Sequence, residues 1–456
     1  MITTRFAPSP TGNIHIGGLR TALYAYAFAH QQNGVCFLRI EDTDQKREVA
    51  GSADRLVPLL ATFGLMWDAV YVQSERAKEG IYANYAHQLV SAGKAFYCQC
   101  DAKNAKVDGY STVLRDPCRD RELTTGAIKL KTPDNEIVSY YDFVLKKDIS
   151  WNTSEVRDAT LLKSDGVFPT YHLAVAVDDH EMAVTYIFRG HDWLPSTPIH
   201  ILVFKALGFE LPMLGHLTDI LDPEGGGKLS KRKGSTSCEG LLADGYLPAA
   251  LLNFIALCGW APKDNSEMFS LEHFVTSFTL DGIQKANPVF NRQKLDWFNR
   301  EYIKLLSAAE QLDAVRPYVA HLTGFDESVF VKCLPLIIER VNKWSDVETM
   351  IDAGDVQYYF ADPIVSTELL TAKGTNIELV QQHLSAVNAL LTAYTGEWTA
   401  EGIKELIMPY ADEQGRTAVL WPLRCALSGQ AKSPDPFTLF YILGPQTSMQ
   451  RVNALA

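Results

Sequence analysis

The hydrophobic positions of the first 41 residues predict a β-α-β unit. Residues 2–7 are expected to form a short strand, followed by a turn rich in proline and glycine. Apolar residues then recur at helical spacing between Leu19 and Ala27, which predicts a helix over residues 16–30. After Gly34, residues 35–41 (VCFLRIE) are nearly all apolar, as in a buried parallel strand. This arrangement predicts a doubly wound parallel sheet.

Two further helical patterns follow, over residues 53–64 and 80–92. Residues 98–168 then change character, with an irregular first part and strand-like runs at 127–131 (AIKLK) and 136–146 (EIVSYYDFVLK). We interpret this segment as an insertion between two halves of the sheet.

The remainder of the chain changes from sheet to helix. Residues 171–193 (YHLAVAVDDHEMAVTYIFRGHDW) return to a strand-rich, buried pattern, and a glycine-rich loop follows at 222–235. From about residue 240 onward nearly every segment has helical spacing. The pattern therefore predicts an α/β half followed by an all-helical half.

The composition fits a globular enzyme. Of the 456 residues, 47% are hydrophobic and 21% are charged, and this length predicts several structural units. The sequence has no apolar run long enough for a membrane span and no signal-peptide pattern, so we expect a soluble, cytoplasmic protein. The eight cysteines are scattered, and only Cys98 and Cys100 are close together, which favours a reducing compartment.

The net charge does not decide whether nucleic acid is a partner. It is −12, from 42 basic and 54 acidic residues, but binding depends on local patches rather than on the sum. Basic residues cluster in three places: Arg115, Arg119 and Arg121; Lys146 and Lys147; Lys228, Lys231, Arg232 and Lys233. Clusters of this kind are more often a solvated face than a nucleic-acid-binding surface.

The turn that enters the first helix has the residue types of an anion site. His15, Gly17 and Gly18 stand where free backbone N–H groups and the positive end of the helix dipole favour a phosphate. Glycine allows a ligand to approach the backbone closely, and histidine adds a hydrogen-bond donor. Taken alone, the pattern is also that of an ordinary helix start.

A second candidate phosphate site is the loop that follows three glycines, residues 225–227. Lys228 and Lys231 flank Ser230 there, and such cations can stabilise charge that develops on a phosphoryl group. Glycine would let the loop close over a bound ligand. Taken alone, the pattern favours an exposed flexible basic loop.

The two patterns together resemble the two ATP signatures of class I aminoacyl-tRNA synthetases. Five segments resemble the bacterial-type glutamyl-tRNA synthetases in particular: RFAPSPTGNIHIGGLRTAL (5–23), LRIEDTDQ (38–45), FPTYHLAVAVDDHEM (168–182), FRGHDWLPSTPIH (188–200) and KLSKRKGS (228–235). The resemblance extends unevenly over the whole length. It implies a Rossmann-type doubly wound parallel sheet with an inserted acceptor-binding domain, followed by an all-α C-terminal half that binds the anticodon.

The same resemblance implies the domain limits. They are 1–83 and 169–210 for the two halves of the catalytic sheet, 84–168 for the acceptor-stem-binding insertion, 211–300 for a stem-contact region with the KLSKR loop, and 301–370 and 371–456 for two helical anticodon-binding subdomains.

The implied reaction joins L-glutamate to ATP, forming glutamyl-adenylate and pyrophosphate, and then transfers the glutamyl group to the 3′ end of tRNA(Glu). An acidic amino acid offers one ammonium and two carboxylates, and each needs a charged partner. Glu41 suits the ammonium, and Arg5 and Arg189 suit the two carboxylates. Which arginine binds which carboxylate is left open. The expected glutamate-binding residues are Arg5, Ala7, Ser9, Glu41, Tyr171 and Arg189.

The nucleotide side of the site is assigned in the same way. We expect His15 and Lys231 to contact the phosphates in the transition state, with Lys228 and Arg232 in support. The expected ATP-binding residues are His15, Gly17, Gly18, Lys228, Ser230 and Lys231. Mg²⁺ would accompany ATP, held mainly by phosphates and water.

The insertion carries a candidate structural zinc site. Cys98, Cys100 and Cys118 are three possible ligands, and family members frequently carry zinc at this place. Tyr110 is the family-style fourth ligand, and Asp116 or Asp120 are alternatives. Three free thiols are the other interpretation.

In the helical half, Arg424 matches an anticodon-contacting arginine of the family by its position from the C-terminus. The alternative is an ordinary arginine on a helix surface. The expected partners are ATP, L-glutamate and tRNA(Glu), with tRNA(Gln) as an open addition, and the expected state is a monomer.

Four other functions can be weighed against this one. An enzyme that glutamylates a modified tRNA base would lack the helical half, and a glutaminyl-tRNA synthetase would carry a β-barrel tail. A nonenzymatic paralogue would be expected to lose His15, Lys231 or Arg5, and all three are present. A small-molecule nucleotidyltransferase would have no use for the helical half.

Overall fold

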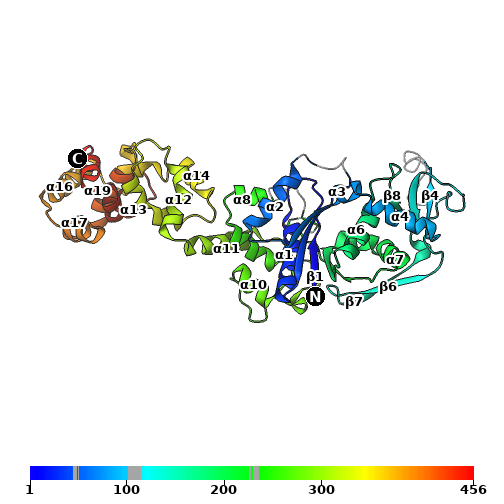
Figure 1. The fold of residues 1–456 in the computed structure, drawn as a ribbon. Coiled ribbons are helices and arrows are strands. Elements are labelled where there is room, and N and C mark those ends of the chain that lie inside the picture. The colour runs from blue at the N-terminus through cyan, green and yellow to red at the C-terminus, as the bar shows by residue number, and fades with distance from the viewer. Residues whose placement is uncertain (45–48, 50, 101–113, 225–226, 230–235) are drawn as a thin grey trace. The chain divides into compact units, whose positions relative to one another are not determined.

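The computed structural model describes the whole chain except residues 45–48, 50, 101–113, 225–226 and 230–235. The described residues divide into two compact units, Met1–Phe298 and Asn299–Ala456 (Figure 1). No described helix is both long enough and apolar enough to span a bilayer.

The first unit begins with the predicted β-α-β unit. Strand β1 (Thr3–Phe6) pairs in parallel with β2 (Val35–Ile40), and β2 pairs in parallel with β3 (Ala69–Val72). Helix α1 (Ile16–Gln31) connects the first two strands and lies beside them in Figure 1. This part of the fold is as predicted.

A second sheet contains four strands in the order β7-β6-β10-β9. These are β6 (Ile137–Asp142), β7 (Lys147–Asn152), β9 (Tyr186–Gly190) and β10 (Met213–Leu217). Strand β10 is parallel to both β6 and β9, whereas β7 is antiparallel to β6. The Thr185 N–H, just before β9, donates to the Thr3 carbonyl at 2.9 Å. This bond places β9 beside β1, so the two sheets continue each other.

The third sheet belongs to the insertion. Its strands are antiparallel and comprise β4 (Ala95–Cys98), β5 (Ala127–Leu130) and β8 (Thr160–Leu162). Strands β6 and β7, although they lie within residues 98–168, join the sheet of β9 and β10 instead.

The strand-rich interpretation of residues 171–193 is wrong for their first half. Residues Tyr171–Glu181 form helix α6, and only Tyr186–Gly190 form a strand. Residues 173–179 of this helix are all buried, so its sequence lacks a polar face. A continuous apolar run of this kind fits a buried helix and a buried strand equally well.

The other helices up to the end of the first unit follow in chain order, and the last of them, α11, contains the boundary between the two units. They are α2 (Ser52–Thr62), α3 (Gln73–Lys78), α4 (Ile81–Ser91), α7 (Thr197–Leu207), α8 (Cys238–Ala243), α9 (Pro248–Ala256), α10 (Leu271–Ser277) and α11 (Arg292–Leu305), with short 3₁₀ helices η2 (Thr153–Glu155), η3 (His191–Ser196) and η4 (Leu280–Gly282). Helix α1 packs against β1, β2 and β9 and also against α9 and α10. Its Tyr24 is fully buried against Phe274 and Phe278, and the hydroxyl donates to the Ala256 carbonyl at 2.9 Å. These contacts hold α1 against the sheet and against the helices α9 and α10.

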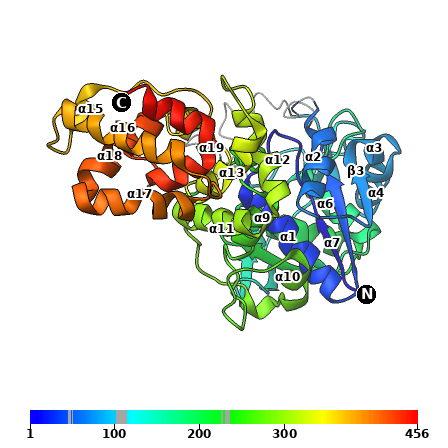
Figure 2. The ribbon, with the colours of Figure 1, turned by 90° about the vertical axis from the view of Figure 1, so that its left-hand side faces the viewer.

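The second unit is helical, as predicted. It contains α12 (Ala308–Val319), α13 (Glu327–Ile338), α14 (Asp346–Asp352), η5 (Gln357–Tyr359), α15 (Thr367–Thr371), α16 (Ile377–Ala393), α17 (Ala400–Gln414), α18 (Arg416–Ser428) and α19 (Pro436–Asn453). Residues 299–456 are all described, and none forms a strand. Helices α16 to α19 pack on one another (Figure 2). Side chains cap several of the helices, for example Ser307 and Glu310 in a capping box on α12.

Candidate active site

One cavity of about 290 Å³ lies at the carboxyl ends of β1, β2 and β9 and at the start of α1. Ligands bind at this edge in doubly wound sheets. The residues predicted to bind glutamate all line it: Arg5, Ala7, Ser9, Glu41, Tyr171 and Arg189. His15 and Gly18 line the same cavity. Residues that are up to 184 positions apart (Arg5 and Arg189) therefore face one space.

Arg5 is buried and already has a carboxylate partner. Its Nε donates to Oδ1 of Asp179 at 2.9 Å, and Nη1 donates to the Phe188 carbonyl at 3.4 Å. Oδ1 of Asp179 also accepts from Nη1 of Arg39 at 2.7 Å. One buried anion thus holds two buried cations.

Glu41 directly follows β2 and faces the cavity. Its Oε1 accepts from Nη2 of Arg39 at 3.2 Å. Burial raises the pKa of Glu41 to about 7, although Arg39 and Arg5 oppose the shift. A positive group of a ligand would stabilise the ionised form further, as the predicted role in ammonium binding requires.

Arg39, Asp178 and Asp179 were not among the predicted site residues. Nε of Arg39 lies 3.7 Å from Oδ2 of Asp178, whose Oδ1 accepts from Nε of Arg76 at 2.9 Å. The available signal was their position in the sequence, because Arg39 lies within the apolar run 35–41 and the aspartates follow an apolar stretch. Charged residues in such runs are buried only when they are paired.

Arg189 is bonded differently from Arg5. Its Nε donates to His216 Nε2 at 2.9 Å, its Nη1 to His200 Nδ1 at 3.0 Å, and its Nη2 to Thr197 Oγ1 at 2.8 Å. Among the residues that the structure describes, none supplies a carboxylate within 4.0 Å of this guanidinium. Arg189 is nevertheless buried, with only 5% of its surface exposed. The cavity therefore contains one buried cation that only neutral groups contact.

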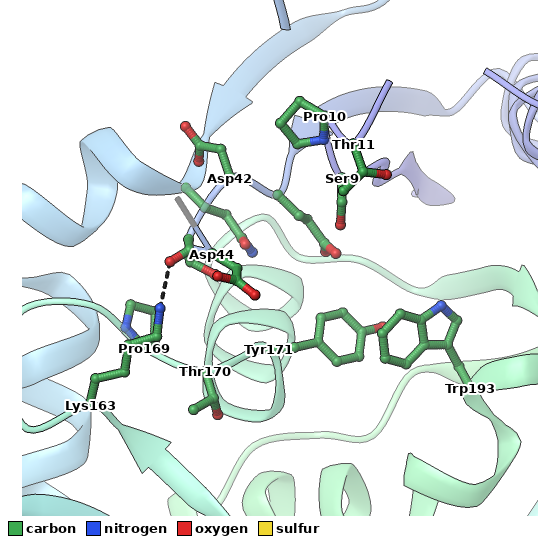
Figure 3. Close-up of a pocket in the computed structure, with 13 residues that line it drawn as sticks. Ser9, Pro10, Thr11, Asp42, Asp44, Lys163, Pro169, Thr170, Tyr171 and Trp193 are labelled. Carbon is green, nitrogen blue, oxygen red and sulfur yellow. Dashed lines mark hydrogen bonds between the residues drawn. The ribbon is translucent and has the colours of Figure 1, made fainter. Parts of the chain in front are cut away.

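A second cavity, of about 270 Å³, adjoins the first and shares Ser9, Glu41, Tyr171 and Trp193 with it (Figure 3). The rings of Tyr171 and Trp193 are 4.0 Å apart, and Figure 3 shows them side by side. At the opposite wall, Nζ of Lys163 donates to the Thr43 carbonyl at 2.7 Å, drawn as a dashed line in Figure 3. The aromatic pair gives this cavity a flat, apolar wall.

The predicted phosphate turn is formed at the start of α1. His15 is the N-cap, and its Nδ1 accepts from the Gly17 N–H at 3.2 Å. A Cβ on Gly17 or Gly18 would meet protein atoms no closer than 3.5 Å, an ordinary contact. Packing within the protein therefore does not require glycine at these two positions, which agrees with a ligand that approaches the backbone.

His15, Gly17 and Gly18 also line a third cavity, of about 400 Å³, together with Lys228 and Leu229. This cavity brings the two sequence signatures to one place. Nζ of Lys228 pairs with Asp192 and lies 2.9 Å from Oδ1 of Asp219. Ser230, Lys231 and Arg232, the other predicted residues of this loop, lie outside the described residues.

The candidate metal site is compact. One ligand atom from each of Cys98, Cys100, Asp116 and Cys118 lies within 4.8 Å of all the others. Asp116, one of the two aspartates left open by the sequence, is thus beside the thiols, whereas Tyr110 lies outside the described residues. Oδ2 of Asp116 also accepts from Nζ of Lys129 at 2.5 Å.

Asp120, the other open alternative, is not in this cluster. Its side chain is 88% exposed, and its Oδ1 lies 3.6 Å from Nζ of Lys131. Three thiols and one carboxylate form a ligand set that suits Zn²⁺.

In the second unit, Arg424 lies on α18 and stacks on an aromatic ring. Its guanidinium carbon is 4.7 Å from the centre of Trp421, and Nη2 donates to the Ala431 carbonyl at 2.7 Å. Nζ of Lys373 lies 4.6 Å from the same ring. The arginine is therefore part of a cationic and aromatic cluster.

Comparisons with known proteins agree with this geometry. A family model described as "tRNA synthetases class I (E and Q), catalytic domain" matches residues 1–297, and one described as "Anticodon binding domain" matches residues 307–456. A glutamate--tRNA ligase of Dehalococcoides mccartyi is 36% identical, over 99% of this chain and 96% of the relative. One of Clostridium botulinum is also 36% identical, over 99% and 97%.

Solved structures are similar over the full length. A glutamate tRNA ligase from Elizabethkingia meningosepticum, solved in complex with its amino acid, has a TM-score of 0.89 and 32% identity, with 100% of this chain and 99% of that one covered. The glutamate-tRNA synthetase of Elizabethkingia anophelis has a TM-score of 0.88 with the same identity and coverage. The chain belongs to the family of class I tRNA synthetases for glutamate and glutamine, with the anticodon-binding domain of that family in its second unit.

Proposed function

We propose that the protein is a glutamate--tRNA ligase, which activates L-glutamate with ATP and transfers it to the 3′ end of tRNA(Glu). The observation that carries this proposal is the single cavity in which Arg5, Glu41 and Arg189 lie beside His15 and Gly18. It offers an anion for an ammonium, cations for carboxylates and a helix start for a phosphate. The names of the full-length relatives support the same substrate.

Activation requires no nucleophilic side chain, because the α-carboxylate of glutamate itself attacks the α-phosphate of ATP and pyrophosphate leaves. The protein contributes alignment and charge. Glu41 would hold the ammonium, and Arg189 and the Asp179-bonded Arg5 would hold the carboxylates. In this arrangement the backbone N–H groups at the start of α1, His15 and Lys228 would meet the phosphates.

Two metals fit the proposed function. Mg²⁺ would enter with ATP and neutralise phosphate charge. A zinc ion would be held by Cys98, Cys100 and Cys118, with Asp116 as the fourth ligand in place of the Tyr110 suggested by the resemblance. A site with four protein ligands is structural, so this zinc would stabilise the fold near β4 and β5.

The remaining assignments complete the proposal. Residues 84–168 would contact the acceptor stem, and residues 301–456 would bind the anticodon, with Arg424 among the contacts. The protein would act as a monomer in the cytoplasm, where its eight cysteines, all without a disulfide, would stay reduced. The loop residues Ser230, Lys231 and Arg232 would complete the ATP site.

The test is a charging assay with purified tRNA(Glu) and tRNA(Gln), each with glutamate, glutamine and aspartate. We expect glutamate on tRNA(Glu), and the tRNA(Gln) arm decides whether the enzyme also charges that tRNA. A Glu41→Gln variant serves as the control for the site, since it keeps the shape and removes the anion. Charging with glutamine in place of glutamate would contradict the proposal.

A further inference from the structure

A buried polar network lies behind Arg189, on the side away from the cavity. Asp142 is the last residue of β6 and His216 lies in β10, and both side chains have no exposed surface. Strand β10 runs between β6 and β9, with Leu214 beside Asp142 and His216 beside Arg189 in register. The three side chains therefore lie on the same face of the sheet, with Asp142 two residues behind the level of His216 and Arg189.

The directions of the hydrogen bonds determine which nitrogen of His216 carries the proton. Arginine can only donate, so His216 Nε2, which is 2.9 Å from Arg189 Nε, must be an unprotonated acceptor. The proton of the neutral ring is then on Nδ1, which donates to Asp142 Oδ2 at 2.6 Å. Burial lowers the pKa of His216 to about 4, in agreement with a neutral ring.

The second imidazole obeys the same rule. His200 Nδ1 accepts from Arg189 Nη1 at 3.0 Å, so its proton is on Nε2, which donates to His172 Nδ1 at 3.2 Å. Burial lowers the pKa of His200 well below its usual value. Both imidazoles in contact with Arg189 are therefore neutral acceptors.

This arrangement orients a cation without neutralising it. Asp179 contacts Arg5 directly and compensates its charge, whereas the ring of His216 stands between Asp142 and Arg189. A buried cation in contact with neutral groups only attracts an incoming anion strongly, because the local dielectric constant is low.

We propose that Asp142 and His216 are positioning residues for Arg189: Asp142 sets the tautomer of His216, and His216 orients the guanidinium toward a carboxylate of the substrate. The inference rests on the proposed function, in which that carboxylate belongs to glutamate. We call the hydrogen-bonded series Asp142 (β6), His216 (β10) and Arg189 (β9) the relay. In this proposal the relay sets the specificity of the cavity for a substrate carboxylate.

The surroundings of Asp142 permit a strict test. Its Oδ1 accepts from the backbone N–H groups of Val144, Leu145 and His216, at 3.0, 2.9 and 3.3 Å. In Asp142→Asn the amide oxygen must occupy this position, so the NH₂ group faces His216 Nδ1. The ring then carries its proton on Nε2, which opposes the N–H of Arg189.

Tyr140 provides the matched control. Its hydroxyl donates to the same Oδ2 of Asp142 at 2.9 Å, and its side chain is also buried. The hydroxyl oxygen also lies 2.9 Å from His216 Nδ1, but the proton of Nδ1 has its shorter contact, 2.6 Å, with Asp142. Tyr140→Phe removes the hydroxyl and its contacts with Asp142 and His216, but Oδ2 of Asp142 still accepts the proton of His216 Nδ1, so the tautomer of His216 is kept. The two variants therefore disturb the same place but differ in what they do to Arg189.

We would measure KM for glutamate and for ATP in tRNA(Glu) charging, together with thermal unfolding. For Asp142→Asn we expect KM for glutamate to rise about 10- to 100-fold, as when a supporting partner of a ligand-binding residue is lost, and KM for ATP to stay unchanged. Tyr140→Phe should keep both values. An unchanged KM for glutamate in Asp142→Asn, or an equal rise in Tyr140→Phe, would overturn the assignment.

A second pair of variants covers the case in which Asp142→Asn does not fold. His216→Gln can place an acceptor where Nε2 lies, whereas His216→Asn reaches only the position of Nδ1. We expect the glutamine variant to bind glutamate better than the asparagine variant, and the reverse order would contradict the relay.

The wild-type reaction separates the two proposals. If wild-type protein charges no tRNA with glutamate, the proposed function fails whatever the variants do. If it charges tRNA(Glu) and the variants keep their KM for glutamate, only the relay fails.

Discussion

The guanidinium of Arg5 is bonded to Asp179, with Arg5 Nε 2.9 Å from Asp179 Oδ1. Both side chains are buried. The same oxygen accepts from Arg39, so Asp179 holds two cations that would otherwise repel each other. Arg189, on the neighbouring strand β9, is contacted by neutral groups. The two arginines that line the cavity therefore differ in electrostatic state, although their sequence positions do not distinguish them.

Asp179→Asn should destabilise the first unit and weaken glutamate binding. The substitution leaves Arg5 and Arg39 buried without their shared anion, and breaking a buried ion pair in this way costs about 3–5 kcal/mol. We expect a lower urea midpoint and a higher KM for glutamate. Asp134→Asn is the control, because that carboxylate is 80% exposed, pairs with Arg115 and Arg119 and should contribute little. Equal urea midpoints for the two variants would contradict the role of Asp179.

Glutamate binding should weaken as the pH falls through neutrality. Burial raises the pKa of Glu41 to about 7, so its carboxylate is roughly nine-tenths ionised at pH 8 and one-tenth ionised at pH 6. Only the ionised form balances an ammonium, and the substrate ammonium stays protonated throughout this range. The dissociation constant of glutamate, measured by calorimetry, should therefore rise between pH 8 and pH 6.

The matching variant for this pH dependence is Glu41→Gln. It cannot ionise, so we expect weak glutamate binding that no longer changes between pH 8 and pH 6. A wild-type dissociation constant that is constant over this range would show that Glu41 does not hold the ammonium.

Features that depend on a continuous stretch of sequence could be predicted, whereas features that depend on contacts between distant residues could not. The turn at His15 and the strand before Glu41 are local patterns, so the sequence predicts the β-α-β unit that the structure shows. Helix α6 was mistaken for strand because burial on all sides removes its polar face. Asp142 and His216 are 74 positions apart, and nothing in the local sequence of either indicates that a sheet brings them to Arg189.

Zinc should bind to the purified protein in an equimolar amount. Burial raises the pKa of Cys98 to about 12, so its thiol is protonated at neutral pH in the absence of metal, and binding must release protons. The affinity should therefore fall as the pH is lowered. Cys100→Ser should lose the metal and speed hydrogen exchange in β4 and β5, whereas Cys425→Ser, in the second unit, should change neither. Retention of zinc by Cys100→Ser would contradict the ligand set.

Arg424→Ala should raise KM for tRNA and leave KM for glutamate and ATP unchanged. The guanidinium lies over Trp421 and bonds the Ala431 carbonyl, so its removal takes away a cationic platform for an unstacked base. Base stacking of this kind is worth roughly 1–3 kcal/mol, which corresponds to about 5- to 150-fold in KM. Initial charging rates measured against tRNA concentration give this value directly.

Arg416, on the same helix, distinguishes a specific contact from general attraction to phosphate. Its side chain is 67% exposed and pairs with Asp412, near the end of α17. Among the described residues, no aromatic ring lies under its guanidinium. Arg416→Ala removes the same charge from α18. If the effect were only electrostatic, both variants would raise KM for tRNA equally, and both would change the salt dependence of this KM by the same amount. If the cluster of Arg424, Trp421 and Lys373 recognises a base, KM for tRNA should rise only in Arg424→Ala, and the rise should persist at high salt.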